Sequence, residues 1–448
     1  MKAIVENNNR IKATIMNKSL VSLLILVLSL ISCSPHVLPN NPAVLTKEVP
    51  TQKSEPTSIV MPVPSVTDDA SVLDLQKNCI PILSAPDNRI IDGNIVFLDN
   101  LGQSLLLVGK NELRIPEEFK GNNGNSEQSV SPDGTLLMFR EVTYEPTQSH
   151  IVLVTSDGQV ARDFPDDQRW VSGITWLSSE YIRYPMTSQT DKEQLRLYAL
   201  NAETGKMREL RTNLPDIADN GSPNWGIDAW AMYFGIKKGV NIVYDSSLTR
   251  VAYPKIQAIY PFYPVVLYNV QNNKELAIAD LESSADPKWS PDGRYFSIVG
   301  SELVTPAQDI YIVKRDGNQF TPLTNLAKLY PKVKIESYGW SPDSSQIAFW
   351  ARLEDSPAGD NNSFLFLFDI VTMKITDLCI KGFGNNPPLG VKTSLNLRGQ
   401  PIWSPDGKKL LITQYDANNQ EVVVIWIDLE NQIAYPIATD LEPIGWMN

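Results

Sequence analysis

The sequence predicts an all-β protein, a β-propeller of seven four-stranded blades, with six or eight blades as alternatives. Two observations favour this fold. A tight-turn phrase occurs four times along the chain, and a second strand–turn–strand phrase occurs seven times. Together they supply about four short strands per unit at a period of roughly 45 to 60 residues, which is typical of propeller blades.

The first phrase predicts a turn between two strands. It reads PKWSPDGRYFSIVG at 287–300, YGWSPDSSQIAFW at 338–350, PIWSPDGKKLLIT at 401–413 and, more faintly, QSVSPDGTLLMFR at 128–140. Proline presets φ for the second position of a type I turn, and aspartate and glycine complete the turn. We therefore interpret the four aspartates as turn formers rather than catalytic groups. They are Asp133, Asp292, Asp343 and Asp406.

The second phrase gives the number of blades, and the chain ends suggest how the ring closes. Runs such as DIYIVKRDGNQFTPL (309–323) follow each turn phrase, and SLLLVGKNELRIPE (104–117) precedes the first one. The strand expected at 94–98 has no tryptophan-bearing strand before it, whereas the chain ends in PIGWMN (443–448). We expect the strand through Trp446 to be the innermost strand of the blade that residues 94–117 begin, because this closes the ring without unpaired edges.

The turn phrase with its following strands resembles the propeller repeat of the TolB family, which is similar to WD repeats. The propeller domains of the dipeptidyl-peptidase family carry a similar phrase. The resemblance covers about residue 90 to the end of the chain, and it implies a propeller of six blades, from which the count of seven departs. It weakens at Trp176, where the turn reads LSSE, and near Tyr244, where the chain reads DSSLTRVAY.

The N-terminal region predicts export. Residues 16–33 read MNKSLVSLLILVLSLISC, a short basic start followed by an apolar run that is short for a membrane span. The Leu-Ile-Ser-Cys ending resembles a bacterial lipobox, which implies that Cys33 becomes the lipidated first residue. We therefore expect a signal peptide over 1–32, starting at Met1 or Met16, then a flexible Pro/Ser/Thr-rich tether over 33–86 and the propeller over 87–448.

Two further cysteines, Cys79 and Cys379, remain after the lipidation site is assigned. In an exported protein, two such cysteines can form a disulfide. The sequence does not show whether their Cα atoms lie within bonding range, so their pairing stays open.

Composition and motifs exclude several function classes. A net charge of −12 and a pI near 4.8 disfavour nucleic acid and anionic lipid surfaces as partners. His36 and His150 are too few for a zinc site built from several imidazoles, and no Gly-x-Ser-x-Gly or phosphate-binding loop occurs. We therefore predict no catalytic residue, no metal and no cofactor. Calcium in the channel and a sialidase-like Arg-Ile-Pro at 114–116 remain alternatives that no ligand or catalytic spacing supports.

An insertion at 213–241 breaks the repeat and carries the candidate binding residues. Within ten residues it holds four aromatic side chains: Trp225, Trp230, Tyr233 and Phe234. Aromatic side chains on a loop of a rigid scaffold are typical of binding surfaces, although these four could instead cover the apolar face of an irregular blade. The segments 352–363 and 381–399 are further candidate loops.

These observations predict a membrane-anchored extracytoplasmic propeller, in the periplasm or at the cell surface, that acts as a binding module. Its partner would be an envelope protein or another macromolecule, it would contact the membrane through its lipid, and we expect a monomer. The alternatives are a hydrolase, lactonase or lyase with its site at the mouth of the channel, and a purely structural component of the envelope.

Overall fold

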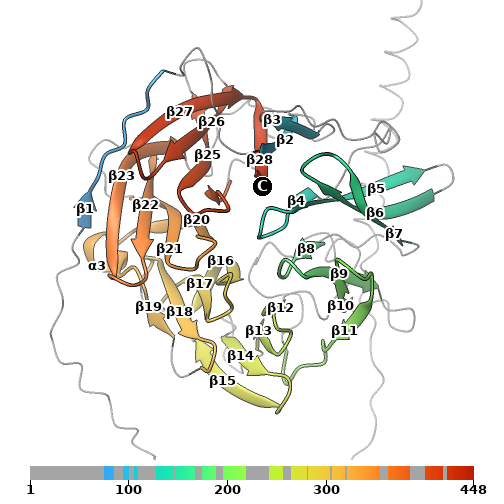
Figure 1. Ribbon diagram of the computed structural model, residues 1–448. Coiled ribbons are helices and arrows are strands. Elements are labelled where there is room, and N and C mark those ends of the chain that lie inside the picture. The colour runs from blue at the N-terminus through green and yellow to red at the C-terminus, as the bar shows by residue number, and fades with distance from the viewer. Residues whose placement is uncertain are drawn as a thin grey trace, which may run out of the picture. The chain divides into compact units, whose positions relative to one another are not determined.

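Seven β-sheets follow one another along the chain and lie around a common centre (Figure 1). The computed structural model describes residues 75–84, 94–99, 105–108, 128–144, 147–166, 174–187, 195–217, 242–255, 264–279, 281–302, 305–317, 320–353, 362–383, 399–416 and 421–448. In this part of the chain the single helix is one turn long, α3 (Leu326–Leu329). The fold is the predicted all-β propeller.

Six of the sheets are complete blades, each with an innermost, two middle and an outermost strand. Blade 1 comprises β4 (Gln128–Val130), β5 (Leu136–Tyr144), β6 (Thr147–Thr155) and β7 (Val160–Asp166). Blade 2 comprises β8 (Thr175–Trp176), β9 (Tyr181–Thr187), β10 (Leu195–Asn201) and β11 (Met207–Leu210). Blade 3 comprises β12 (Val243–Tyr244), β13 (Arg250–Pro254), β14 (Val265–Asn269) and β15 (Lys274–Ala279).

The second half of the ring repeats this arrangement. Blade 4 comprises β16 (Glu282–Trp289), β17 (Tyr295–Ser301), β18 (Asp309–Lys314) and β19 (Thr321–Pro322). Blade 5 comprises β20 (Lys334–Trp340), β21 (Gln346–Arg352), β22 (Asn362–Asp369) and β23 (Lys374–Phe383). Blade 6 comprises β24 (Ile402–Trp403), β25 (Lys409–Asp416), β26 (Glu421–Asp428) and β27 (Ile433–Thr439).

The seventh sheet closes the ring with strands from both ends of the propeller. Its described strands are β28 (Leu441–Met447), β2 (Asn94–Asp99) and β3 (Leu105–Val108), in that order. The strand β28 pairs antiparallel with β2, from Asn94 opposite Met447 to Asp99 opposite Leu441. The predicted closure by the strand through Trp446 is confirmed. The structure has six complete four-stranded blades, the alternative to the predicted seven, and the three-stranded closing sheet stands where the seventh blade was expected.

The burial pattern explains why the middle strands are so apolar. All five residues of β14, VVLYN, are buried, because neighbouring blades cover both faces of a middle strand. The outermost strand β11, MREL, is exposed at its first three positions and buried only at its last. Apolar side chains of adjacent blades thus form the clusters that hold the ring together, such as the one that joins blades 2 and 3 around Leu197 and Tyr253.

The propeller unit begins before the predicted boundary at residue 87. Residues 75–83, which we call the strap, contain β1 (Leu75–Lys77), and this strand pairs in parallel with β23 of blade 5. The described residues of the strap belong to the same compact unit as the blades. The end of the predicted tether is therefore part of the folded domain, because its backbone hydrogen bonds to an outermost strand instead of to water.

Candidate functional site

Each of the seven sheets carries one large or branched side chain at the same position of its innermost strand. The seven residues are Val130, Trp176, Tyr244, Trp289, Trp340, Trp403 and Trp446. Five of them are tryptophans, and each indole N–H donates to an oxygen of the preceding blade. The acceptors are Ser129 O, Val243 O, Ser297 Oγ, Gly339 O and Ile402 O, at 2.9 to 3.4 Å.

This position is a contact between blades. The side chains of Trp340 and Trp403 are buried and that of Trp289 is half-buried. Tyr244 takes the same place in blade 3, and its hydroxyl donates to Arg211 O at 2.6 Å. These aromatic residues therefore belong to the architecture and not to a binding site.

The four turn phrases have one hydrogen-bonding pattern. In each, the serine hydroxyl donates to the aspartate two residues later, at 2.5 to 2.7 Å. In blade 5, partial burial raises the pKa of the Asp343 carboxyl, but bonds from Ser341 and Ser345 outweigh it and hold that pKa below its usual value. The interpretation of these aspartates as turn formers agrees with this geometry.

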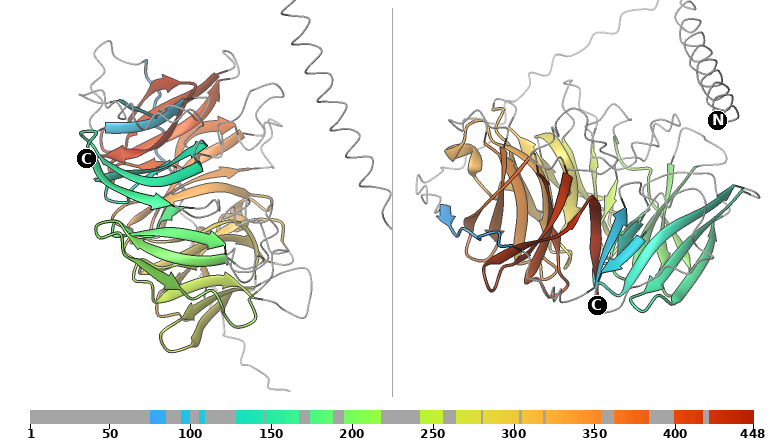
Figure 2. Two further views of the ribbon diagram at one scale, coloured as in Figure 1. Left: turned by 90° about the vertical axis from the view of Figure 1, so that its right-hand side faces the viewer. Right: turned by 90° about the horizontal axis from the view of Figure 1, so that it is seen from above.

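Neighbouring turns also contact one another, and together they make one end of the propeller, which we call the turn face. The Ser344 hydroxyl of blade 5 accepts a bond from the backbone N–H of Asp292 in the preceding blade, at 3.1 Å. In the closing sheet the C-terminal residue takes the place of a turn, because Asn448 N–H donates to Gly134 O at 2.8 Å. The right-hand view in Figure 2 shows the C-terminus at this end of the strands.

Gly134 is required at this junction for two reasons. Its φ of +72° lies in the left-handed region that favours glycine, and a Cβ there would meet Pro405 Cγ at 2.9 Å. The turn of blade 1 is therefore packed directly against the turn of blade 6 and the C-terminus.

Blade 3 carries the same turn with its two side chains exchanged. Asp245 stands where the other turns have serine, and Ser247, which stands at the aspartate position, donates to it at 2.6 Å. The Asp245 side chain is 1% exposed, and Arg315 of blade 4 reaches it at 3.0 Å. The departure from the repeat near Tyr244 is thus a reversed pair, in which the aspartate precedes the serine. Its buried carboxylate is paired with an arginine of the next blade, which the local sequence does not indicate.

The opposite ends of the strands form the loop face, at which the three candidate binding segments leave and re-enter the described chain. The register places Arg352 beside Ser363 and Lys334, away from the turn of blade 5. Phe383 pairs with Asn362 at the same end. In blade 3, Ile217 forms an isolated bridge with Lys255, which follows the loop-face end of β13.

Polar side chains are fixed at these attachment points. In blade 5, the side chain of Glu336 is 8% exposed; it accepts a bond from Ser363 Oγ at 2.6 Å and lies 3.9 Å from Arg352 Nε. In blade 3, Lys255 Nζ lies 2.5 Å from Glu275 and 3.8 Å from Asp216. Both groups hold the chain where a candidate segment starts or ends.

A lysine connects the innermost parts of three consecutive blades. Lys288 of β16 donates to Tyr338 O of blade 5 at 2.6 Å and to the side chain of Gln400, just before blade 6. Its ammonium also lies 4.7 Å from the centre of the Tyr338 ring, a cation–π distance. No local sequence pattern indicates this group, because Lys288 and Gln400 lie 112 positions apart and only the tertiary fold brings them together.

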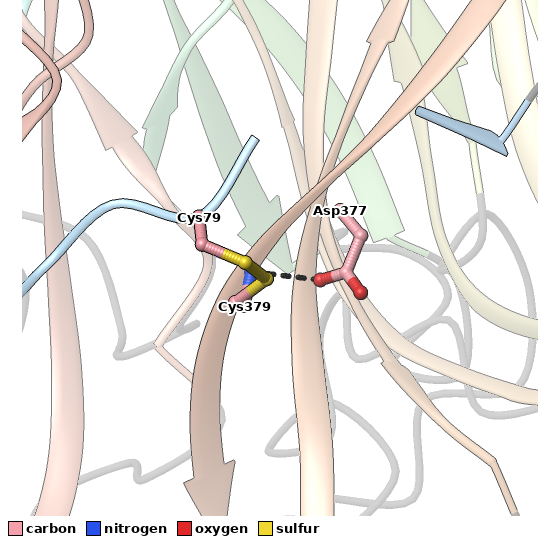
Figure 3. Close-up of a disulfide and its surroundings, with 3 residues drawn as sticks. All are labelled: Cys79, Asp377 and Cys379. Carbon is pink, nitrogen blue, oxygen red and sulfur yellow. Dashed lines mark hydrogen bonds between the residues drawn. A yellow bond between two sulfur atoms is a disulfide. The ribbon is translucent and has the colours of Figure 1, made fainter. Parts of the chain in front are cut away.

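The predicted site residues divide into two groups. Cys33, Trp225, Trp230, Tyr233 and Phe234 lie outside the described residues. Cys79 and Cys379 form a disulfide with a Cα–Cα distance of 4.8 Å (Figure 3). The backbone N–H of Cys379 donates to Asp377 Oδ1 at 2.7 Å beside it.

The described residues contain neither a cluster of metal ligands nor a membrane-spanning helix. Within these ranges no group of three or more His, Cys, Asp or Glu side chains is arranged to hold a metal ion. No helix in the same ranges has the length and apolarity needed to cross a membrane.

No protein-family model matches the chain. A stretch of 147 residues is 25% identical to the "Uncharacterized peptidase YuxL" of Bacillus subtilis (strain 168), covering 29% of this chain. The match includes 22% of that protein, so the chain spans about a fifth of the length of this relative.

Two solved structures illustrate the similarity at low sequence identity. TolB from Acinetobacter baumannii is 13% identical with a TM-score of 0.39, over 80% of this chain and 67% of that one. An oligogalacturonate lyase in complex with manganese is 13% identical with a TM-score of 0.45, over 81% and 86% of the two chains. The class of this protein, a β-propeller, is defined by its own sheet order.

Proposed function

We propose that this protein is a lipid-anchored extracytoplasmic propeller that binds another macromolecule of the cell envelope through its loop face. The observation that carries the proposal is the common attachment of the three candidate segments at that face. The turn face, in contrast, is built from short turns that contact each other and the C-terminus. Rigid scaffolds commonly present binding residues on such segments.

The scaffold supports this role physically. The ends of the candidate segments are attached to buried or half-buried groups, among them Glu336 with Ser363 and Lys255 with Glu275. A segment whose ends are fixed loses less conformational entropy when it binds, which favours affinity. Aromatic residues such as Trp225 and Trp230 would then supply the largest share of the binding energy.

Affinity capture from a native envelope extract tests the proposal. The tagged full chain is compared with a Trp225→Ala/Trp230→Ala variant, and with a control that removes apolar side chains from the turn face, Val371→Ser/Met207→Ser. Val371 and Met207 are 81% and 55% exposed, so the control changes the surface without changing the core.

We expect the loop-face variant to lose the captured partner while it keeps its melting temperature, and the control to retain the partner. Equal capture by all three proteins would overturn the assignment of the loop face. A large loss of stability in the tryptophan variants would return these residues to the core, since truncating buried aromatics costs about 3–5 kcal/mol.

The lipid anchor is tested separately. Cys33→Ala is expected to leave an unlipidated precursor that does not fractionate as a lipoprotein. A normally lipidated mature protein from this variant would exclude Cys33 as the modified residue. The competing hypothesis of a hydrolase, lactonase or lyase predicts turnover of a small molecule by the purified protein and no stable macromolecular partner.

A further inference from the structure

The strap is fastened across the outer edges of two neighbouring blades. On blade 5, β1 extends the sheet in parallel with β23, from Leu75 opposite Ile375 to Lys77 opposite Asp377. Backbone bonds continue from Asn78 N–H to Asp377 O and from Ile80 N–H to Leu378 O, at 2.9 and 3.1 Å.

On blade 6, the strap is held by β27. Leu83 N–H donates to Ala434 O at 2.8 Å, and Ala434 N–H donates to Pro81 O at 3.1 Å. Between the two edges, the side chain of Ile80 is 5% exposed and packs in the apolar cluster that blades 5 and 6 share. The disulfide from Cys79 adds a covalent bond at the centre of these contacts.

The position of the strap in the chain determines how a pull on the N-terminal segment reaches the propeller. Everything upstream of residue 75 reaches the propeller through the strap, and the next described strand is β2 of the closing sheet. Because β2 lies between β28 and β3, its removal would separate the two ends of the ring. A pull on the upstream chain that reached Asn94 would break the β2–β28 hydrogen bonds one after another.

We propose that the strap carries this load, so that a pull on the N-terminal side passes through Cys79 into blades 5 and 6 and leaves the closing sheet unloaded. The source of the pull, a membrane anchor, rests on the proposed function. The route of the load does not, because it depends only on the disulfide and on the order of the strands.

Single-molecule extension tests the route. One handle is attached through a peptide tag at the N-terminal end of the full chain and the other through a tag inserted in the exposed turn between β26 and β27, at 430–432, so that the handle itself does not pull on β28. Every protein carries Cys33→Ala so that no third thiol or lipid interferes. The disulfide-bonded protein is compared with Cys79→Ser/Cys379→Ser, and with the disulfide-bonded protein after reductant is added to the folded molecule. The last comparison remains informative if the double variant fails to fold.

In the oxidised protein, we expect no extension from the residues that the disulfide encloses. The cross-link spans 300 positions, so at about 3.4 Å per residue its removal adds roughly 1,000 Å to the fully extended length. The Cys79→Ser/Cys379→Ser variant and the reduced protein should also begin to unfold at a lower force than the oxidised protein. Equal final lengths for oxidised and variant proteins, or unchanged opening force, would overturn the proposal.

A protease site placed within 85–93 provides a second measurement. After cleavage, the upstream fragment should stay joined to the propeller until reductant is added, and the cut oxidised protein should resist extension as the uncut one does. Release of the fragment without reductant would show that the load passes only through the backbone. None of these outcomes depends on a lipid or on a binding partner, so their failure is distinct from failure of the proposed function.

Discussion

Loss of the Cys79–Cys379 disulfide is expected to cause one of the largest stability changes available in this protein. The bond closes a loop of 300 positions, and in the chain-entropy model a cross-link of that span stabilises the folded state by about 5–6 kcal/mol. The propeller unit, Asp69–Asn448, has about 380 residues. At about 2.1 cal/mol/K per residue the unfolding entropy is about 0.8 kcal/mol/K, so the melting temperature should fall by about 7 °C.

Differential scanning calorimetry of Cys79→Ser, Cys379→Ser and the double variant measures this fall, with Cys33→Ala in every protein. The three variants should melt together, because removing either sulfur or both removes the same cross-link. Reductant should lower the melting temperature of the parent protein to theirs and leave the variants unchanged. The reasoning would be refuted if reductant did not change the melting temperature of the parent protein and the parent melted within 1–2 °C of the variants. A difference near 7 °C is expected, which corresponds to about 5–6 kcal/mol.

Three other predictions concern the ring. Deleting 441–448 removes β28 with the buried Trp446, and the single change Trp446→Ala should already lower the free energy of unfolding by about 3–5 kcal/mol in denaturant titrations. An unchanged denaturation midpoint in the deletion variant would contradict ring closure by this strand. The pKa of Asp343 is lower in the folded than in the unfolded protein, so its charge stabilises the fold above the unfolded pKa of about 3.9, and this stabilisation is lost as pH falls. The melting temperature of Asp343→Asn should therefore decline less steeply than that of the parent below about pH 5. Parallel curves for the two proteins would argue against this role. Arg315→Ala leaves the buried Asp245 without its cation and should lower the free energy of unfolding, measured by chemical denaturation, by about 1.5–3 kcal/mol. The control Arg294→Ala removes an exposed arginine and should change this free energy very little. Equal effects of the two variants would contradict the reversed-pair interpretation.

Local chemistry made much of the architecture predictable. The turn phrase fixes backbone dihedrals and a serine–aspartate hydrogen bond within five residues, so the hairpins follow from the sequence alone. Repetition then implies a ring, and the pairing of β28 with β2 shows that the strand through Trp446 completes the sheet that residue 94 begins. The candidate binding aromatics were predicted from a break in this repeat, and Trp225 and Trp230 lie outside the described residues.

The sequence by itself determined the propeller class, the closing strand and the structural role of the turn aspartates, because each depends on short-range pattern or on a repeat. Only the tertiary structure decided which distant groups meet. It pairs Cys79 with Cys379, attaches the strap to blades 5 and 6, and brings Arg315 to Asp245 and Lys288 to Gln400. These contacts depend on how far each blade is turned from the next, and such a rotation is the sum of side-chain packing over whole sheet faces.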